Sequence, residues 1–311
     1  MSVKAVCITG GAGFIGSHLA AAFVGQGCRV LVIDDLSSGR RENLPAEAEF
    51  HPLDIRSPEA AELLAGAGPD LLVHQAAQMD VRRSVADPVF DADVNVVGSL
   101  NLFEAARRGG VSQILFASTG GVIYGEQERL PTPEDVALCP LCPYGVAKLA
   151  IERYLFYYCA TYGIDAACLR YANVYGERQN PHGEAGVVAI FLNHLLAGRR
   201  PTIHGDGEQT RDYIHVSDVV RANLAAVGRK GFLTYNVGTG RETSVVELFR
   251  ELAAVTGIDI EPRFGPAKSG EQRRSAIDSG RLRAELGVAD PLELREGLRR
   301  TAAWFREHPP P

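Results

Sequence analysis

The sequence lacks the features of several broad classes of protein. No apolar run approaches the roughly 20 residues of a membrane-spanning helix, and no signal-peptide pattern precedes the first strand-like segment. The formal net charge of -6 leaves no basic excess, which argues against nucleic acid as a partner. We therefore expect a cytoplasmic protein with neither a membrane nor a nucleic-acid partner.

The six cysteines lack the spacing of a metal or disulfide framework. Cys139 and Cys142 form a single C-x-x-C, and the second pair that a zinc site would need is missing. We interpret these two as loop cysteines and predict no metal site. The other four lie in apolar runs and are expected to be small buried residues, namely Cys7, Cys28, Cys159 and Cys168.

What is present is an alternation of two periodicities in the first half of the chain. Short apolar runs, typical of buried strands, span residues 3–10, 29–35, 49–55, 70–77 and 113–119. Helical spacing separates them at residues 16–27, 57–68 and 93–110. This pattern predicts an α/β fold with a doubly wound parallel sheet, a Rossmann domain. We expect it to comprise residues 1–170 plus about 212–238, with a smaller, partly interleaved C-terminal lobe of about 171–211 plus 239–311.

The segment "ITGGAGFIGSHLA" follows the first predicted strand and opens a helix. Its glycines, Gly10, Gly13 and Gly16, have the spacing of the dinucleotide fingerprint, in which the backbone approaches a pyrophosphate at a helix N-terminus. Asp34 ends the second strand, where a carboxylate binds the adenosine ribose hydroxyls. The sequence therefore predicts a bound dinucleotide.

Asp34 favours NAD, because its charge would repel the 2′-phosphate of NADP. Arg40 and Arg41 follow in "SSGRREN" and leave NADP open as the alternative, although solvated loop charges are the simpler interpretation. Asp54, after the third strand, lies where the sheet edge would meet the adenine. It is alternatively a turn or helix-cap aspartate.

Tyr144 and Lys148 lie four residues apart and so share one helical face. Tyrosine has an ordinary pKa of about 10, too high for a base at neutral pH. A nearby ammonium and the positive ring of an oxidised nicotinamide would both favour the phenolate. The pair is common by chance, but after a nucleotide fold and the strand "ILFAST" it indicates a proton-transfer site.

These residues carry a resemblance to a known family. Its motifs include "TGGAGFIG", "HQAAQMDVRRSVADP", "STGGVIYGE", "PYGVAKLAIE", "LRYANVYGERQNPHGEAGVVAIF" and "GDGEQTRDYIHVSDV". The chain resembles extended short-chain dehydrogenases/reductases of the nucleotide-sugar branch over nearly its whole length. It is most similar to the short bacterial UDP-glucose (UDP-galactose) 4-epimerases.

The resemblance implies two sets of binding residues. The NAD contacts would fall on Gly10, Gly13, Phe14, Ile15, Gly16, Asp34, Asp54, Ile55, Gln75, Ala76, Ala77, Asn95, Ser118, Tyr144 and Lys148. The nucleotide-sugar contacts would fall on Asn173, Val188, Thr202, His204, Arg211, Lys268, Glu271 and Ser275. Arg211 is a fork-shaped cation suited to a diphosphate, whereas Lys268 replaces a second arginine common in the family.

Gly120 and Gly121 distinguish this chain from related dehydratases and decarboxylases, which carry a carboxylate just after the catalytic hydroxyl. Their absence disfavours loss of water or carbon dioxide, and we expect open space beside the sugar. Relatives place the catalytic hydroxyl at the position of Gly120. Thr119 would therefore serve as a helper only if the chain has already curled out of the strand, and otherwise a water takes that role.

The mechanism that the resemblance implies is epimerisation at carbon 4 of a UDP-hexose through a transient 4-keto sugar, with NAD retained. Tyr144 and Lys148 would be catalytic, with Thr119 as the possible helper. Alternatives are UDP-N-acetylglucosamine or UDP-glucuronate as the substrate, a reductase, or a catalytically dead NAD-sensing protein. Ser275 stands where an aromatic residue restricts some members to simple hexoses. The helix from Tyr144 to Tyr162 is apolar around most of its circumference, so the face that does not cover the sheet would be exposed in a monomer. The resemblance implies a homodimer in which this helix pairs with the one near residues 95–108.

Overall fold

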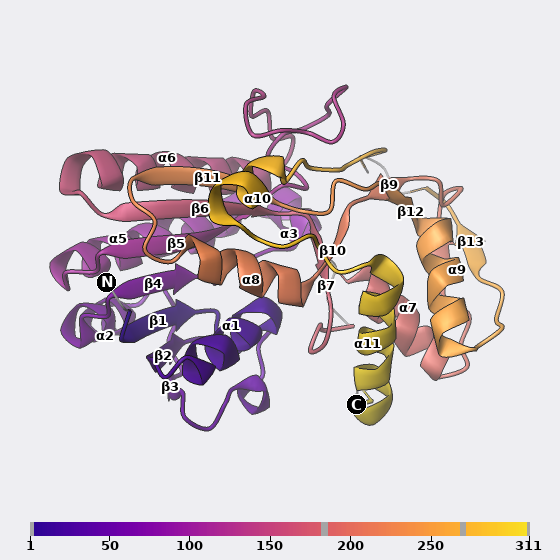
Figure 1. Cartoon of the computed structure of the whole chain (residues 1–311), viewed down its shortest axis with the longest axis horizontal. Coiled ribbons are helices and arrows are strands. Elements are labelled where there is room, and N and C mark those ends of the chain that lie inside the picture. Colours follow the sequence, from indigo (N-terminus) through magenta and orange to yellow (C-terminus); the bar gives the residue numbers. More distant parts are fainter. Residues whose placement is uncertain (1–2, 182–185, 268–271, 310–311) are drawn as a thin grey trace.

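The computed structural model describes residues 3–181, 186–267 and 272–309. Its centre is a seven-stranded parallel sheet in the order β11-β6-β5-β4-β1-β2-β3 (Figure 1). The strands are β1 (Ala5–Thr9), β2 (Arg29–Ile33), β3 (Glu49–His51), β4 (Leu71–His74), β5 (Gln113–Thr119), β6 (Asp165–Tyr171) and β11 (Phe232–Val237). The predicted doubly wound parallel sheet is confirmed.

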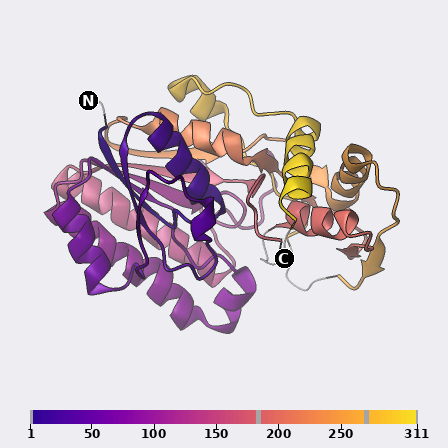
Figure 2. The same ribbon diagram turned by 90° about the horizontal axis from the view of Figure 1, so that it is seen from below.

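Helices cover both faces of this sheet, because the strands are apolar on both sides. One core packs the sheet against α1 (Phe14–Gly25), α8 (Val216–Ala226) and α10 (Gly280–Leu286). The other packs it against α2 (Pro58–Ala67), α5 (Gly98–Arg108) and α6 (Pro143–Tyr162). Figure 2 shows this second layer along one side of the sheet.

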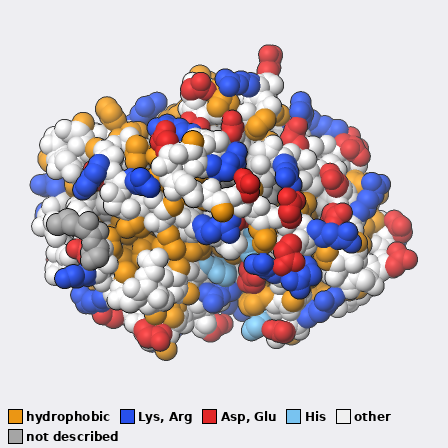
Figure 3. Space-filling view, in the orientation of Figure 1, with side chains coloured by type: hydrophobic (Ala, Val, Ile, Leu, Met, Phe, Trp, Pro, Cys, Tyr) orange, Lys and Arg blue, Asp and Glu red, His pale blue; other side chains and the backbone are white. Residues whose placement is uncertain are grey.

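A third apolar core lies in the C-terminal half, among α7 (Val187–Leu196), α9 (Val245–Thr256) and α11 (Leu294–Glu307). Short strand pairs surround it: β8 (Thr202–His204) with β13 (Arg263–Gly265), and β9 (Thr210–Arg211) with β12 (Thr243–Ser244). A further pair, β7 (Asn173–Tyr175) with β10 (Tyr213–His215), begins two residues after the end of β6. Charged side chains of both signs cover this half in Figure 3. The domain division stays a prediction.

Two predicted elements differ from the structure. The third strand ends at His51 instead of Ile55, because Pro52 has no N–H to continue the ladder. The helix predicted over 93–110 begins as a π-helical turn, Asp93–Val97, and becomes α5 at Gly98. Two short helices precede it, α3 (Val81–Ala86) and α4 (Pro88–Ala92). A Cβ on Gly98 would lie 2.8 Å from Ile55 Cδ1, so glycine permits this close packing.

The described part of the chain contains no helix long and apolar enough to cross a membrane, and the cytoplasmic location stays a prediction. Cys7 and Cys168 are buried, as expected for small apolar residues, whereas Cys28 and Cys159 are only half-buried. Cys28 lies just before β2 and Cys159 near the end of α6, positions whose partial exposure apolar neighbours in the sequence do not reveal.

Candidate active site

The glycine loop joins β1 to α1 at the carboxyl edge of the sheet. Gly10 has a φ of +66°, and a Cβ there would lie 2.6 Å from Ala76 N. A Cβ on Gly16 would lie 2.1 Å from Gly10 O, so the helix could not approach the loop with any other residue. No side chain caps α1, whose first turn begins with Phe14 and Ile15. The free N–H groups of this turn form an anion site suited to a pyrophosphate.

Asp34 follows β2 and is 7% exposed. Its Oδ2 accepts a hydrogen bond from Ala12 N at 2.9 Å, and its Oδ1 accepts one from Leu36 N at 2.8 Å. Burial raises the pKa of this carboxyl, while the backbone donors oppose the rise. Asp34 thus ties the glycine loop to the strand end and keeps lone pairs for ribose hydroxyls.

The two arginines that left NADP open have other contacts. The Arg41 guanidinium lies 5.2 Å from the centre of the Phe50 ring, a cation–π contact. Arg40 Nη1 lies 3.9 Å from Glu42 Oε1 at the surface. With the Asp34 carboxylate in the loop, this arrangement favours NAD over NADP.

Asp54 follows β3 and holds Arg56 in a forked ion pair. Arg56 Nε and Nη2 donate to Asp54 Oδ2 at 3.0 and 2.5 Å, and Arg56 N donates to Oδ1 at 2.8 Å. The hydrogen bonds from Arg56 lower the pKa of the Asp54 carboxyl, so it stays ionised. The adjacent Ile55 is 6% exposed and belongs to the core. Both the turn role and the expected position near an adenine fit this geometry.

The segment after β4 lies next to the glycine loop. Gln75 N donates to Thr9 O at 3.1 Å, and Ala76 N donates to Thr9 Oγ1 at 3.3 Å. Gln75, Ala76 and Ala77 are half-buried, so they line the same edge as Gly10. Three adjacent positions of the predicted cofactor set therefore meet the glycine loop.

Asn95 lies in the π-helical turn and is 1% exposed. Its Oδ1 accepts from Gln78 N at 2.9 Å, and its Nδ2 donates to Gln78 O at 2.9 Å and to Asp91 Oδ1 at 3.0 Å. The side chain therefore fixes the loop after β4. Because the amide groups of Asn95 already make these hydrogen bonds, any effect of Asn95 on a bound cofactor would come mainly from the position that it gives this loop.

Tyr144 and Lys148 stand one turn apart at the start of α6. Pro at the first helical position begins this helix, after Cys142 as the N-cap residue. The Lys148 ammonium donates to Ala117 O at 2.8 Å and lies 5.7 Å from the centre of the Tyr144 ring. It also lies 4.6 Å from the centre of the Phe116 ring. Lys148 is 2% exposed, so its ammonium is buried beside the end of β5.

The electrostatics of this pair differ from the simplest expectation. Burial raises the pKa of Tyr144, and the charge of Asp91 raises it further. Burial also lowers the pKa of Lys148 to about 7, against the opposing effect of Asp91. The chain alone therefore does not produce a phenolate at neutral pH. A further positive charge, such as an oxidised nicotinamide ring, is needed to lower the pKa of Tyr144.

Ser118 belongs to a buried polar network that the sequence analysis missed. Its Oγ donates to Glu152 Oε1 at 2.6 Å, and Glu152 is paired with Arg170, whose Nη2 lies 2.7 Å from Oε2. Arg170 Nη1 also donates to Tyr124 OH at 2.9 Å. Glu152 lies four residues beyond Lys148, so the helical spacing that revealed the first pair would also have pointed to it.

Thr119 is the last residue of β5 and pairs with Tyr171 of β6. The ladder continues one step further, because Gly120 N donates to Tyr171 O at 2.7 Å. The chain has therefore not curled into the loop at Thr119, which is 9% exposed. The condition for Thr119 as the helper is therefore not met, which favours a water in that role, and a direct role of Thr119 stays a prediction.

The expectation of open space at both glycines is wrong for Gly120. A Cβ there would lie 2.5 Å from Ile277 Cδ1, so this position faces packed side chains. Gly121 differs, since within 4 Å its Cβ would meet, among the described residues, only Thr119 Oγ1, at 3.9 Å. The reason is that the two residues point in opposite directions as the strand ends, which the glycine pair in the sequence does not show.

The predicted sugar-binding residues come from several elements. Asn173 lies on β7 and its N–H donates to Asp212 O at 2.9 Å, and Arg211 lies on β9, where Nη1 donates to Thr210 O at 2.7 Å. Thr202 and His204 lie on β8, with His204 Nδ1 3.3 Å from Pro266 O. Val188 is buried on α7 in the third core, and Ser275 is 6% exposed. Lys268 and Glu271 lie outside the described residues.

Asp212, next to Arg211, is a residue that the sequence analysis did not select. Its Oδ1 accepts from Thr239 N and Oγ1 at 2.9 and 2.6 Å, and its Oδ2 accepts from Gly240 N at 3.0 Å. A Cβ on Gly238 would lie 2.5 Å from Asp212 Oδ2. This buried carboxylate fixes the strand of Arg211 to the turn after β11.

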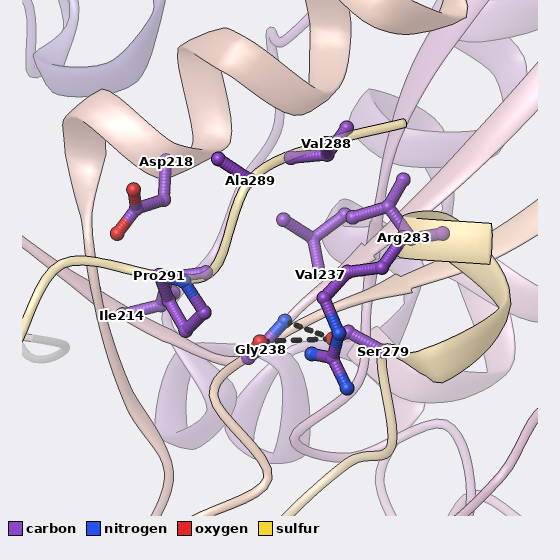
Figure 4. Close-up of a pocket in the computed structure, with 10 residues that line it drawn as sticks. Ile214, Asp218, Val237, Gly238, Ser279, Arg283, Val288, Ala289 and Pro291 are labelled. Carbon is purple, nitrogen blue, oxygen red and sulfur yellow. Dashed lines mark hydrogen bonds between the residues drawn. The ribbon is translucent and has the colours of Figure 1, made fainter. Parts of the chain in front are cut away.

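A small pocket of about 20 Å³ lies away from these residues, near the end of β11 (Figure 4). Asp218 and Arg283 line it, and Ser279 exchanges hydrogen bonds of 2.8 and 2.9 Å with the backbone of Gly238. Its volume suits about one water molecule, far below the several hundred Å³ of a ligand pocket. It is not the substrate site.

Comparison with known proteins agrees with this geometry. The NAD dependent epimerase/dehydratase family matches residues 6–238. The chain belongs to this family. A UDP-glucose 4-epimerase from Mycolicibacterium smegmatis is 47% identical, over 96% of this chain and 97% of the relative.

Two solved structures of family members are similar over almost their whole length. A UDP-glucose 4-epimerase from Thermotoga maritima, crystallised with UDP-glucose, is 44% identical with a TM-score of 0.95. The alignment covers 98% of this chain and 99% of that one. A UDP-glucose 4-epimerase from Thermus thermophilus, in complex with NAD, is 41% identical with a TM-score of 0.93. It covers 98% of this chain and 100% of that one. The predicted family resemblance is confirmed.

Proposed function

We propose that this protein interconverts UDP-glucose and UDP-galactose by epimerisation at carbon 4, with NAD retained between turnovers. The observation that carries the proposal is the site's composition. A dinucleotide loop and the Tyr144/Lys148 pair meet at one sheet edge, while positions 120 and 121 carry no acid for elimination. Whole-length similarity to UDP-glucose 4-epimerases supports it.

The residues present fit NAD. A Cβ on Gly10 or Gly16 would clash with neighbouring backbone, so both positions need glycine. Without side chains, the backbone of the loop is open to a pyrophosphate. Asp34 stands at the strand end as an ionisable acceptor for ribose hydroxyls. Bound NAD supplies the acceptor and donor of the hydride and, when oxidised, a positive ring.

The chain's own residues would handle the proton and the orientation of the sugar. Tyr144 would take the proton of the 4-hydroxyl and would return it to the same oxygen after the 4-keto sugar has turned and the opposite face of carbon 4 has been reduced. Lys148, anchored on Ala117 O, stabilises the phenolate. Gly121 leaves the room in which the 4-keto sugar turns, and Gly120 packs against Ile277 instead. Arg211 and the neighbouring strands of the C-terminal lobe would hold the nucleotide diphosphate.

The test is turnover of UDP-galactose by freshly purified protein without added nucleotide. We expect UDP-glucose as the product and NAD released on denaturation, in about equal amounts with the protein. A cofactor-free protein that needs stoichiometric NADP and releases its reduced form would contradict the proposal and indicate a reductase. Absence of turnover with NAD bound would indicate the NAD-sensing alternative.

A second substrate is favoured by Ser275. The side chain is small and follows Glu271 by four residues in the sequence, where the resemblance places a sugar-binding position, so we expect room there for a 2-acetamido group. We expect some activity on UDP-N-acetylglucosamine. Ser275→Tyr should abolish this activity and spare UDP-glucose. If the wild type has no N-acetyl turnover, or the substitution leaves it unaffected, the pocket assignment is wrong.

A homodimer is the expected assembly. On α6 the side chains of Val146, Tyr154 and Tyr157 form an exposed stripe, with 53%, 41% and 45% of their surface accessible. Leu155 and Tyr158 lie on the opposite face of α6, which covers the sheet. Val97, before α5, is 54% exposed on the neighbouring segment. An apolar stripe of this kind is typical of a covered interface.

A further inference from the structure

Asp91 on α4 is a buried carboxylate that neither the resemblance nor the proposed mechanism uses. It is 1% exposed. Its Oδ1 accepts from Gln78 Nε2 at 2.9 Å and from Asn95 Nδ2 at 3.0 Å. Its Oδ2 is buried and has no hydrogen-bond partner among the described residues. A buried carboxylate oxygen without a partner is costly, so its retention needs a reason.

Helix α4, which carries Asp91, packs against α6, whose first turns carry Tyr144 and Lys148. Its charge acts on Tyr144, on Lys148 and on Cys142. Lys148 has three N–H donors, of which one goes to Ala117 O in the described structure. A buried anion with a spare acceptor and a buried cation with spare donors thus lie on two helices that pack together.

The other titratable groups around Lys148 leave Asp91 as the unbalanced charge. Burial lowers the pKa of His74 to about 3, so this imidazole on β4 is neutral. Burial raises the pKa of the Cys168 and Cys142 thiols, so both are protonated at neutral pH. Glu152 on α6 is paired with Arg170 at 2.7 Å. Glu152 also favours the charged form of Lys148, but Asp91 has the larger effect and, unlike Glu152, has no ion-pair partner among the described residues.

We propose that Asp91 is a positioning residue for the reaction, whose carboxylate keeps Lys148 as a charged ammonium beside Tyr144. The inference rests on the proposed function. Burial lowers the pKa of Lys148 to about 7 even though the charge of Asp91 opposes this fall. Lys148 also lowers the pKa of Asp91, which burial raises, so each group supports the charge of the other.

The sign of the effect on activity follows from this pairing. Turnover needs Lys148 protonated, so it is lost as pH rises through the pKa of Lys148. Removal of the Asp91 charge lowers that pKa, so the alkaline limb of the kcat profile should move to lower pH. A shift of about one pH unit would reduce kcat on the alkaline side about tenfold relative to the wild type.

The experiment compares kcat against pH for wild type, Asp91→Asn and Asp91→Glu with UDP-galactose. Asparagine keeps an acceptor for Gln78 and Asn95 and removes only the charge, whereas glutamate restores the charge. We expect the alkaline limb to move in Asp91→Asn and to return toward the wild-type position in Asp91→Glu. Asp290→Asn removes an exposed carboxylate far from the site and should leave the profile unchanged.

If the profile of kcat against pH for Asp91→Asn runs parallel to that of the wild type, at whatever rate, the inference is overturned. Asp91 would then only anchor the loop after β4 through its hydrogen bond with Gln78. An equal shift in Asp91→Glu would also overturn it, because charge would not be the cause. If Asp91→Asn does not fold, Asp91→Ser, with the same expected shift, replaces it. Failure of the proposed function is distinguishable, since the wild type would then not convert UDP-galactose at any pH.

Discussion

The buried pair Glu152 and Arg170 joins the catalytic helix α6 to strand β6, and we expect it to dominate the stability of this region. Their side chains are 3% and 4% exposed, with contacts of 2.9 and 2.7 Å in a fork. Glu152→Gln removes the charge and leaves the guanidinium buried and unbalanced. Breaking a buried pair in this way costs about 3–5 kcal/mol. The matched control is Glu49→Gln, which breaks a forked pair with Arg29 at 2.8 Å on the surface. There we expect about 0–1 kcal/mol.

The assay is thermal unfolding followed by circular dichroism. For a chain of this length, 1 kcal/mol corresponds to about 2 °C in Tm, so Glu152→Gln should lower Tm by roughly 6–10 °C and Glu49→Gln by at most about 2 °C. The double variant Glu152→Met with Arg170→Met should recover most of the loss, because it removes the unbalanced charge. If the two single variants unfold within about 2 °C of each other, the buried charge is not the cause and the reasoning fails.

Three further outcomes test the site and the assembly. Tyr144→Phe should nearly abolish turnover, whereas Thr119→Ala should retain measurable activity, with a loss in kcat no larger than the roughly 10-fold to 1000-fold of a single helper. Equal losses with the fold and bound NAD intact would make Thr119 a full catalytic partner. Gly16→Ala should yield protein without NAD, because the new Cβ would lie 2.1 Å from Gly10 O, and absorbance of the denatured supernatant checks this. Light scattering should give a dimer at micromolar concentration, and Tyr154→Glu, which places a charge in the exposed stripe, should give a monomer.

The sequence could reveal those parts of the site that depend on local order. The glycine loop and Asp34 follow from a strand, a turn and a helix within one short segment. Tyr144 and Lys148 follow from helical spacing. These local patterns also gave the layered sheet, because each strand carries its own apolar run.

The remaining features depend on residues far apart in the chain. Ser118, Glu152 and Arg170 meet only because β5, β6 and α6 are adjacent in the fold. The Gly120 packing depends on Ile277, which lies more than a hundred residues away. The π-helical turn at Asn95 likewise reflects packing against the loop after β4, and helical periodicity does not distinguish it from α5.

The position of β11 at the edge of the sheet has a consequence for synthesis of the protein. This strand pairs with β6 along its full length, from Phe232 opposite Ala166 to Val237 opposite Tyr171. Until residues 232–237 leave the ribosome, β6 presents an unpaired row of backbone groups, although the other six strands of the large sheet have already been made. Such an edge readily joins other chains, so nascent protein passes through a stage in which aggregation competes with folding. A gene shortened just before β11 should therefore direct its product into inclusion bodies.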